Sequence, residues 1–423
     1  MITDQAYTMI EGGICAAKGI RAGGLNCGLN PDPDKYDLAM FVSDTDCEAA
    51  AVYTQNKVKG APILVTKEHL AKNGGKVRAV IANSKNANTC NADGMEKAEE
   101  MCALAADAMG LKTEEIAVAS TGVIGETLPI EPIRSHIDAL AADLSYDGGG
   151  RAEYAIMTTD TVAKEVAVEF TLDGKVCHLG GMAKGSGMIH PNMATTLNFI
   201  TTDAAISSDL LQKMLSEIVK VTYNCMSVDG DTSTNDMVLV MANGLAGNDR
   251  IVSDAGHPGK VEEAPTTGYG IVYKALWLVM VNLTRMLAAD GEGAGKFITC
   301  TVKGAKDDKS AIAVAKSIIS SSLVKCAIFG ADANSGRIMC ALGYADADVD
   351  VSKVDIDLAS DAGVMPAYRN GYAESFDEDF AKNLLSCEEI EIRLDLHDGA
   401  GEATAWGCDM TYDYVRINGD YRS

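Results

Sequence analysis

Hydrophobic residues recur along the chain with two periods, one typical of strands and one typical of helices. In the segment 159–185, apolar and polar positions alternate on both sides of Asp173-Gly174, a dipeptide that favours a hairpin turn, so two strands are expected there. The apolar stretch 237–244 predicts a buried strand by its length and β-branched content, and 297–305 predicts another. The stretch 117–129 predicts a strand that leaves into a glycine-rich turn.

Apolar residues spaced three and four apart predict helices elsewhere. The clearest helix, 207–226, follows a serine that can cap it, and it places these residues at helical spacing: Leu210, Leu211, Met214, Leu215, Ile218 and Val219. Further helices are expected over 97–110, 131–145 and 274–290, and the segment 310–330 predicts a helix followed by a strand. No fixed-period repeat or low-complexity linker interrupts this order, and the mixture predicts an α+β fold with helices packed on sheets.

The charge of the chain excludes one class of partner. Its 423 residues are enough for two or more domains, and they carry 60 acidic against 36 basic side chains, a formal net charge of -24. Such a charge repels polyanions, and there is no basic stripe with interleaved aromatic residues. We therefore expect no nucleic acid as a partner.

Cysteine usage and hydropathy predict a cytoplasmic protein. The 12 cysteines are scattered, without CxxC pairs or metal-type clusters, which is typical of a reducing compartment. The N-terminal MITDQAYTMIEGG has neither the basic region nor the apolar core of a signal peptide. The longest apolar run, ALWLVMV at 275–281, is too short to span a bilayer and predicts a buried helix, so no membrane partner is expected.

Short motifs leave little room for common cofactor chemistry. The segments GETLPI, GSGMIH and GEGAGK do not meet the spacing of a phosphate-binding loop. With only six histidines and no GxSxG elbow, no Ser-His-Asp set can be identified. His190 lies near the Ala194–Thr195 bond, but a lone histidine beside a proline is more often a structural group than a base. We expect no metal and no redox cofactor.

The segment 190–207, HPNMATTLNFITTDAAIS, places two threonines between a glycine-rich run and an apolar stretch. A threonine hydroxyl is a weak nucleophile unless a base lies beside it. Cleavage between Ala194 and Thr195 would free an α-amine next to that hydroxyl, and such an amine titrates at about 7.7 to 8.0, a suitable range for a general base. The hydroxyl can make the cut itself by an N-to-O acyl shift. From the residues alone, this chemistry is one hypothesis among several.

Long segments of the chain resemble the ornithine acetyltransferase family, also called glutamate N-acetyltransferases, of arginine biosynthesis. The segment KGSGMIHPNMATTLNFITTDA resembles the self-cleaving segment of that family. Nearly the whole chain shares the resemblance, through GIRAGGLNCGLNPDPDKYDLAMFVSD, YTQNKVKGAPI, NSKNANTC, STGVIGETLP, VDGDTSTND, DGEGAGKF and WGCDMTYDYVRINGDYRS in the same order.

The resemblance implies a self-processing enzyme. It implies cleavage before Thr195 into an α chain, 1–194, and a β chain, 195–423, which stay together, with two of each in a heterotetramer. Thr195 would take acetyl from N-acetylornithine as an ester and pass it to glutamate, which yields ornithine and N-acetylglutamate. The implied fold is a layered αββα sandwich, shared with self-processing aminopeptidases. One version of the family also accepts acetyl-coenzyme A as a co-substrate, and the acidic surface gives that anionic donor no long-range attraction.

The resemblance also assigns site residues. Thr121, by its hydroxyl, and Gly122, by its N–H, match the positions that stabilise the oxyanion of the tetrahedral intermediate. Five further residues match substrate-binding positions: Thr158, Lys184, Glu292, Asn418 and Ser423. We expect Lys184 to pair with a carboxylate and Glu292 with a cationic amine, because charge-assisted hydrogen bonds are short and strong.

Three segments depart from the family pattern. Thr196 and Gly295 stand where the family has methionine and threonine, and FGADANSGRI (329–338) replaces GRDPNWGRI. The two adjacent threonines leave Thr195 as the nucleophile by the register of KGSGMIHPN, and the changed loop puts any binding role of 329–338 in question. Two alternatives stay open: an aminopeptidase that hands its acyl group to water, and a noncatalytic protein of the same fold that binds a small molecule.

Overall fold

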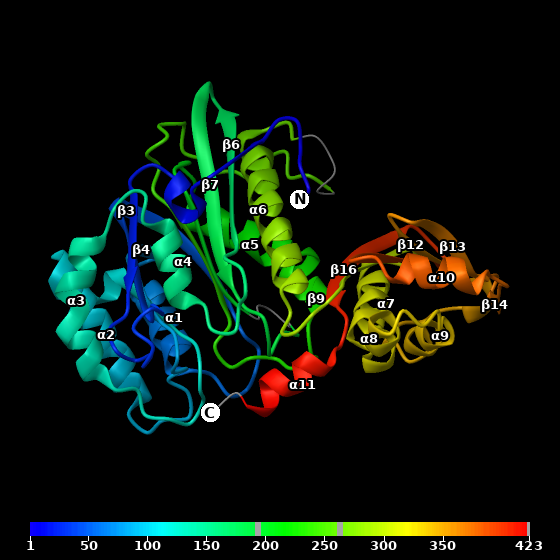
Figure 1. The fold of residues 1–423 in the computed structure, drawn as a ribbon. Helices are drawn as coiled ribbons and strands as arrows, with labels where there is room; N and C mark the ends of the chain where they lie inside the picture. The colour runs from blue at the N-terminus through cyan, green and yellow to red at the C-terminus, as the bar shows by residue number, and fades with distance from the viewer. Residues whose placement is uncertain (191–195, 260–264, 421–423) are drawn as a thin grey trace. The chain divides into compact units, whose positions relative to one another are not determined.

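The chain divides into two compact units. The computed structural model describes residues 1–190, 196–259 and 265–420. Unit 1 comprises 1–185, 192–220 and 232–283, and unit 2 comprises 186–191, 221–231 and 284–423, each taken over its described residues (Figure 1). Ala194, Thr195 and Ser423 lie outside the described residues, so the predictions for these three residues are not tested.

Unit 1 is built on one mixed sheet in the order β1-β6-β7-β8-β10-β3-β4-β5, with β2 also paired to β3. Its strands are β1 (Thr8–Ile10), β2 (Ile20–Leu25), β3 (Leu38–Tyr53), β4 (Lys76–Asn83), β5 (Ile116–Ser120), β6 (Glu165–Leu172), β7 (Lys175–Lys184), β8 (Leu197–Thr202) and β10 (Met237–Ala242). The long strand β3 connects two halves. Its first part pairs with β2 and its last part with β10, and its pairing with β4 is irregular between Val42 and Cys47.

The two halves of this sheet face each other. The rings of Phe41 in β3 and Phe199 in β8 pack edge to face, with centroids 5.1 Å apart, although two strand spacings separate their strands along the sheet order. Both rings belong to one buried cluster, together with residues of β10 and of α4. Strand alternation sends Ile200 to the opposite face, where a Cβ on Gly181 would touch both Ile200 and Leu283.

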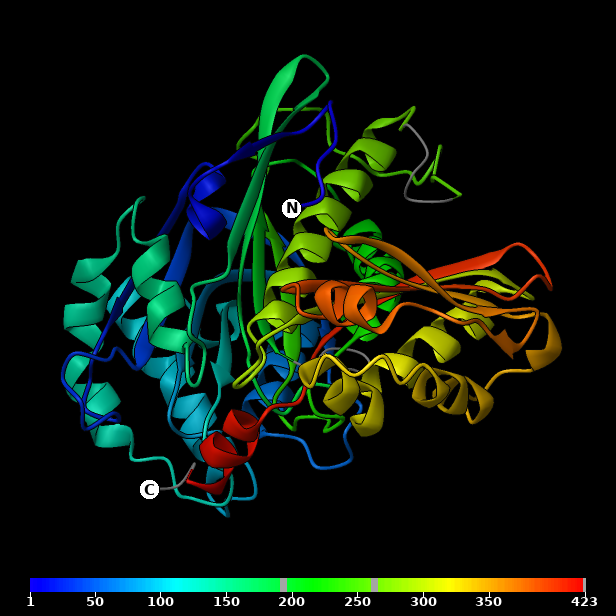
Figure 2. The ribbon, with the colours of Figure 1, turned by 45° about the vertical axis from the view of Figure 1, so that its right-hand side comes forward.

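Helices cover the outer faces of the two halves (Figures 1 and 2). The helices of unit 1 are α1 (Ala61–Lys72), α2 (Gly94–Met109), α3 (Ile130–Asp143), α4 (Gly149–Ile156), α5 (Ser208–Val221) and α6 (Gly268–Ala289), whose last residues belong to unit 2. A second buried cluster joins α1, α2 and α3 to the residues of β3 that alternate with Phe41. The helices α5 and α6 lie along the other half, so unit 1 is the αββα sandwich that was expected.

Unit 2 is an α+β layer of its own, with the sheet order β14-β13-β12-β15-β11-β16-β9. Its strands are β9 (Met226–Ser227), β11 (Phe297–Ala305), β12 (Asp355–Ser360), β13 (Gly363–Arg369), β14 (Tyr372–Ala373), β15 (Glu389–Asp395) and β16 (Gly401–Cys408). Its helices are α7 (Asp308–Ser320), α8 (Ser322–Phe329), α9 (Gly336–Gly343), α10 (Glu378–Leu385) and α11 (Tyr412–Gly419). Along β11 and β15, the alternate residues Ile298, Cys300, Ile390 and Ile392 form the buried face.

Most elements expected from the apolar pattern are confirmed, and two are wrong. The hairpin forms at Asp173-Gly174, where both residues have the positive φ that a tight hairpin turn requires. The strand expected in the second half of 310–330 is instead the helix α8, because Ser321 caps it and Val324 and Ile328, four residues apart, are buried on one face. The helix expected over 207–226 ends at Val221, and Met226 already pairs with β16.

The helix α6 includes the apolar run 275–281 and is a core helix. By length and composition alone it could cross a membrane, but 78% of its most apolar window is buried inside the structure. Burial of this kind is what a core helix shows.

Candidate functional site

The loop after β5 places Thr121 and Gly122 at the edge of the unit 1 sheet. The N–H of Thr121 donates to the carbonyl of Asn83 at 3.0 Å. Gly122 has φ of +132°, and a Cβ there would lie 2.2 Å from the carbonyl carbon of Lys85, so glycine is required. Within the part of the chain that the structure describes, no acceptor takes the N–H of Gly122. This N–H is thus available to a ligand.

Lys184, the last residue of β7, lies beside Thr121. The lysine is 8% exposed, and its Nζ is 3.3 Å from Thr121 Oγ1. The hydrogen bond uses a lone pair of the hydroxyl and leaves its proton for another acceptor. The structure therefore brings together three of the residues assigned by resemblance, Thr121, Gly122 and Lys184, in an arrangement that can hold a negatively charged oxygen.

Asp160 lies next to the Lys184 segment, and the sequence analysis did not identify it. Its carboxylate is 2.7 Å from Lys164 Nζ, and both side chains have no solvent exposure. It also accepts the N–H of Gly185 at 2.6 Å and that of Thr158 at 3.0 Å. Burial by itself would raise the pKa of Asp160, but Lys184 and Lys164 outweigh it and bring the pKa to about 2. Thr158 is thereby held in place beside the site.

The strand β8 begins at Leu197, two residues after the predicted nucleophile in the sequence. Leu197 pairs with Lys184 in the antiparallel β7–β8 ladder, so the chain enters β8 opposite the end of the strand that carries the lysine. The carbonyl of Thr196 accepts the N–H of Met237 at 3.0 Å, and its Oγ1 accepts a hydrogen bond from Asn198. Both the backbone carbonyl and the side-chain hydroxyl of Thr196 therefore have structural partners.

Asp236 is a second residue that the sequence analysis missed. It is 3% exposed, and its Oδ2 has no hydrogen-bond partner among the described residues. Burial raises the pKa of Asp236 well above its usual value, although Ser233 and Lys184 act in the opposite direction. A carboxyl of this kind is neutral where an ordinary aspartate is charged. It stands one residue before Met237, on the segment that binds Thr196.

Unit 2 brings Glu292 and Asn418 together. Asn418 on α11 donates to Glu292 Oε2 at 2.7 Å, and Glu292 is 6% exposed. The N–H of Glu292 donates to the carbonyl of Ser186 at 2.8 Å, and a Cβ on Gly187 would lie 2.3 Å from the glutamate carboxyl. The glycine therefore makes room for that carboxyl. Lys184 and Glu292 belong to different units.

The start of α11 is tied to the loop that carries Glu292. Thr411 donates to the carbonyl of Gly293 at 2.6 Å and caps α11, and a Cβ on Gly293 would lie 2.7 Å from the Tyr414 nitrogen. At Gly295, where the family has threonine, the backbone N–H donates to the Asp409 carboxylate at 2.8 Å. In the changed loop, Arg337 bonds to the carbonyl of Leu323 at 2.9 Å, a contact within the fold of unit 2.

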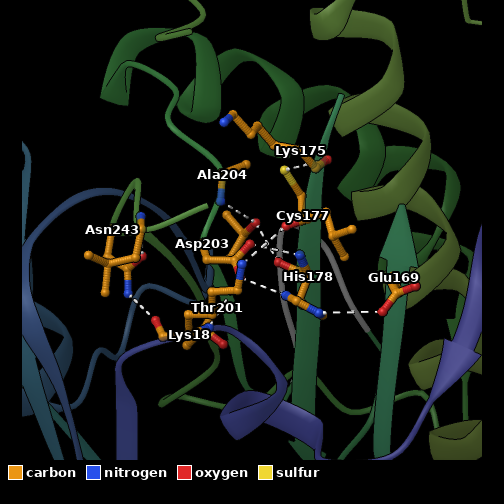
Figure 3. Close-up of polar contacts among 12 residues, drawn as sticks. Lys18, Glu169, Lys175, Cys177, His178, Thr201, Asp203, Ala204 and Asn243 are labelled. Atoms are coloured by element: carbon orange, nitrogen blue, oxygen red, sulfur yellow. Dashed lines mark hydrogen bonds and ion pairs between the residues drawn. The ribbon is translucent and has the colours of Figure 1, made fainter. Parts of the chain in front are cut away.

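Two histidines, His190 and His178, have structural partners. His190 bonds to Ser227 at 3.1 Å, and burial, with Lys316 second, lowers the pKa of this imidazole to about 4. His178 lies between Asp203 at 2.7 Å and Glu169 at 3.6 Å, which resembles part of a catalytic triad (Figure 3). Among the described residues, the ring nitrogens of His178 have only these two carboxylates as side-chain partners, and the hydroxyl of Thr202 donates to the backbone carbonyl of His178 at 2.8 Å. Asp203 also accepts the Lys18 N–H at 3.2 Å and so ties the N-terminal segment to the sheet.

Among the described residues, no group of three histidine, cysteine, aspartate or glutamate side chains could hold a metal ion.

Comparison with known proteins finds close relatives over the whole chain. Residues 21–423 match the model of the ArgJ family. The arginine biosynthesis bifunctional protein ArgJ 1 of Clostridium acetobutylicum is 48% identical over 391 residues, which are 92% of this chain and 93% of that protein. The ArgJ protein of Bacillus subtilis is 44% identical over 423 residues, 100% of this chain and 99% of that protein. Among solved structures, the ornithine acetyltransferase of Mycobacterium tuberculosis, complexed with ornithine, is 35% identical, covering 44% of this chain and 100% of its own, with a TM-score of 0.41.

Proposed function

Because the chain belongs to the ArgJ family, we propose that it moves acetyl from N-acetylornithine to glutamate through an ester on Thr195. The family and its near full-length relatives make the chain an acetyltransferase of arginine biosynthesis. We propose four further points: the covalent intermediate, the cleavage that creates the nucleophile, the substrates and the acetyl donors.

The observation that carries the proposal is the group formed by Lys184, Thr121 and Gly122 beside the start of β8. Lys184 Nζ lies 3.3 Å from Thr121 Oγ1, and Leu197, two residues after Thr195, pairs with Lys184 in the sheet. Acyl transfer at Thr195 needs donors that stabilise the tetrahedral oxyanion. The Thr121 hydroxyl and the Gly122 N–H are suited to this role. Losing one such donor typically costs about 2.7 to 4 kcal/mol of barrier.

The chemistry follows from a free N-terminal threonine. Cleavage between Ala194 and Thr195 frees an α-amine, which takes the proton of the Thr195 hydroxyl as its oxygen attacks the acetyl carbonyl. The tetrahedral oxyanion collapses, the C–N bond to ornithine breaks, and the leaving amine takes the proton. Glutamate then attacks the ester by the reverse sequence and leaves as N-acetylglutamate. One difficult transfer becomes two easier ones.

The substrate contacts are assigned by charge. Lys184 pairs with a substrate carboxylate, supported by the buried Asp160 that also holds Thr158. Glu292, held by Asn418, pairs with the ammonium group of ornithine. Ser423 is assigned to substrate binding by the resemblance alone. Ornithine is bound in the crystal structure of the M. tuberculosis protein, and we carry this ligand over to the present chain.

We also propose a second acetyl donor and an oligomeric state for the enzyme. One version of the family uses only N-acetylornithine and another also accepts acetyl-coenzyme A; the relatives are named bifunctional, which favours acetyl-coenzyme A as a second donor. No other cofactor takes part. We propose that the enzyme works in the cytoplasm as a heterotetramer of two α chains, 1–194, and two β chains, 195–423.

The test begins with the intact mass and N-terminal sequencing of purified protein. We expect two pieces, 1–194 and 195–423, the second beginning at Thr195. Thr195→Ala should stay uncut and inactive, whereas Thr196→Ala should still be cleaved and active, because the proposed chemistry uses only the residue at the new N-terminus. An active, unbroken chain, or an active Thr195→Ala variant, would refute the proposal.

Measurements of acetyl transfer and of binding separate the alternatives. Acetyl from N-acetylornithine should appear on glutamate, whereas delivery to water would identify a hydrolase of the aminopeptidase type. Binding without turnover would identify a noncatalytic protein. Formation of N-acetylglutamate from acetyl-coenzyme A and glutamate decides whether the second donor is used.

A further inference from the structure

The side chain of Asn235 uses all its hydrogen-bonding capacity in the interior of unit 1. Its Nδ2 donates to the carbonyls of Ala87 at 2.6 Å and Ser120 at 3.0 Å. Its Oδ1 accepts from the hydroxyls of Thr89 and Thr234, both at 2.6 Å. The residue is 5% exposed, so these four contacts replace water rather than compete with it.

The partners require an amide at this position. Backbone carbonyls only accept, so the NH₂ group must face Ala87 and Ser120, and this fixes the orientation of the amide. A carboxylate of the same shape would place an oxygen against two carbonyl oxygens. The space is also closed, since a Cβ on Gly60 would lie 2.6 Å from Nδ2 and 2.7 Å from Oδ1. A longer amide such as glutamine does not fit this space.

The two carbonyls bound by Asn235 belong to the chain segments that shape the Thr121-Gly122 loop. Ser120 immediately precedes Thr121, and its hydroxyl is held by Asn83 at 2.6 Å. The Ala87 N–H donates to Val123 at 3.0 Å, directly after Gly122. The backbone on both sides of the Thr121-Gly122 loop is thus linked, directly or through one residue, to a single amide.

The same amide is joined to the strand after the proposed cleavage point. Two residues beyond Asn235, the N–H of Met237 donates to the carbonyl of Thr196 at 3.0 Å. From Met237 on, β10 pairs with β8 in parallel register, Met237 beside Leu197. Asn235 therefore stands where the oxyanion loop and the strand after Thr195 are both anchored to one segment.

We propose that Asn235 is a positioning residue for acetyl transfer, which fixes the Thr121 and Gly122 donors relative to the strand that follows Thr195. The inference rests on the proposed function for its catalytic consequence. Oxyanion donors act on the transition state, so a displaced loop lowers kcat and leaves substrate binding nearly unchanged. A misplacement of about 1 Å can cost about 100-fold in rate.

The decisive variant is Asn235→Asp, which keeps the shape and removes the donor. We expect kcat for transfer from N-acetylornithine to glutamate to fall about 100-fold, with KM changed less than about twofold. The matched control is Asn248→Asp. Asn248 is 7% exposed and also donates to two carbonyls, Ala205 at 3.2 Å and Asp249 at 2.8 Å, but it does not bond to the Thr121-Gly122 loop. The control should keep the kcat of the unsubstituted enzyme.

A second variant leaves Asn235 in place. Gly60 has φ of −62°, so alanine fits its backbone, and the three atoms nearest to an added Cβ all belong to the Asn235 amide. Gly60→Ala should push the amide and lower kcat in the same direction, and it provides the test if Asn235→Asp does not fold. Unchanged kcat in a folded Asn235→Asp, or a change confined to KM, would overturn the inference.

Hydrogen exchange separates this inference from the proposed function. Amides of residues 116–125 should exchange faster in Asn235→Asp, or in Gly60→Ala, than in Asn248→Asp. Equal exchange would overturn the positioning role whatever the activity. If the unsubstituted chain transfers no acetyl, the proposed function and the catalytic consequence fail together, and the exchange data still decide whether Asn235 holds the loop.

Discussion

Two buried aspartates of unit 1 show how partners decide the state of a residue. Both lie near Lys184, and both are deeply buried, which alone favours the neutral acid. Asp160 has Lys164 at 2.7 Å and two backbone N–H donors, and its pKa falls to about 2. Asp236 has an oxygen without a partner among the described residues, and its pKa rises. The pKa values of these two aspartates are therefore shifted in opposite directions.

Asp160→Asn should strongly destabilise the fold, because it leaves the Lys164 ammonium buried without its carboxylate. Breaking a buried pair costs about 3 to 5 kcal/mol. Urea denaturation measures the loss. The matched control is Glu68→Gln, which removes an i,i+4 pair of nearly equal length, 2.6 Å, with side chains 58% and 49% exposed. That control should change the free energy of unfolding far less, and equal effects in the two variants would contradict the assignment.

Asp236→Asn should change the pH dependence of stability. The raised pKa means that the unfolded chain loses this proton at lower pH than the folded chain. The free energy of unfolding contributed by Asp236 therefore falls as the pH rises above about 3.9, the ordinary aspartate value. Asparagine does not titrate, so the variant should gain stability relative to the unsubstituted chain as the pH rises above about 3.9. Urea denaturation at several pH values tests this, and a difference independent of pH would refute it.

Glu292→Gln should raise the KM for N-acetylornithine, because the neutral amide loses the charge-assisted bond to the substrate ammonium. Hydrogen bonds to charged groups contribute about 1.5 to 3 kcal/mol, so a rise of about 10- to 100-fold is expected. Glu391→Gln, in an ion pair with Arg393 on the same unit, is the control and should keep the KM. An unchanged KM in Glu292→Gln would remove this role.

At the scale of elements, the loop after β5 is shaped by close approach of two backbones. Thr121 and Val123 bond to the segment 83–85, and Gly122 lies between them. A Cβ on Gly122 would lie 2.2 Å from Lys85, whereas a Cβ on Gly125, three residues later, meets nothing within 4 Å. Both glycines have positive φ, +132° and +83°, so alanine would be strained at either position. Only at Gly122 would the added Cβ also collide with a neighbouring backbone, so comparing the two variants separates strain from collision.

Gly122→Ala should reduce kcat by at least about 100-fold, because the loop must shift and the N–H donor moves with it. Gly125→Ala carries only the strain of a positive φ, about 1 to 2 kcal/mol, and should keep most of the activity. The measurement is kcat for acetyl transfer by both variants, assayed at a temperature at which both are folded. Similar kcat values in the two variants would argue against an oxyanion role for Gly122.

The elements also show where local patterns suffice. The hairpin at Asp173-Gly174 was predicted because its turn chemistry and its alternation are both local. The segment of α8 was expected as a strand because a short apolar run fits either structure. It is a helix because its buried residues Val324, Lys325 and Ile328 face the interior, where Lys325 Nζ bonds to the carbonyl of Cys408.

For the whole molecule, the strands that precede and follow the proposed cleavage point share one sheet. Strands β7 and β3 precede Thr195, and β8 and β10 follow it, yet all four lie in one sheet. The β7–β8 ladder alone pairs six residues on each side. We therefore expect two pieces joined by such ladders and by a common buried cluster to remain one folded body if that peptide bond is cut.

We expect the cleaved halves to migrate together in native conditions and to separate only in denaturant. Analytical ultracentrifugation should give about twice the 44.5 kDa chain mass, as the proposed heterotetramer requires. Native and denaturing mass spectrometry of the same sample measure both expectations. Release of a free 1–194 piece without denaturant would contradict the shared sheet, and a species of one chain mass would contradict the heterotetramer.

The sequence by itself determined most strands and helices, the hairpin turn at Asp173-Gly174 and the segments that identify the family, because these depend on neighbours along the chain. It did not determine α8, whose short apolar segment is compatible with either a strand or a helix. It also assigned Thr121, Lys184, Glu292 and Asn418 by resemblance. Only the tertiary structure brought Lys184 to Thr121 across 63 positions and Asn418 to Glu292 across 126. It alone decided the opposite states of Asp160 and Asp236 and the saturation of the Asn235 amide, because burial and hydrogen-bond partners arise from packing between distant segments.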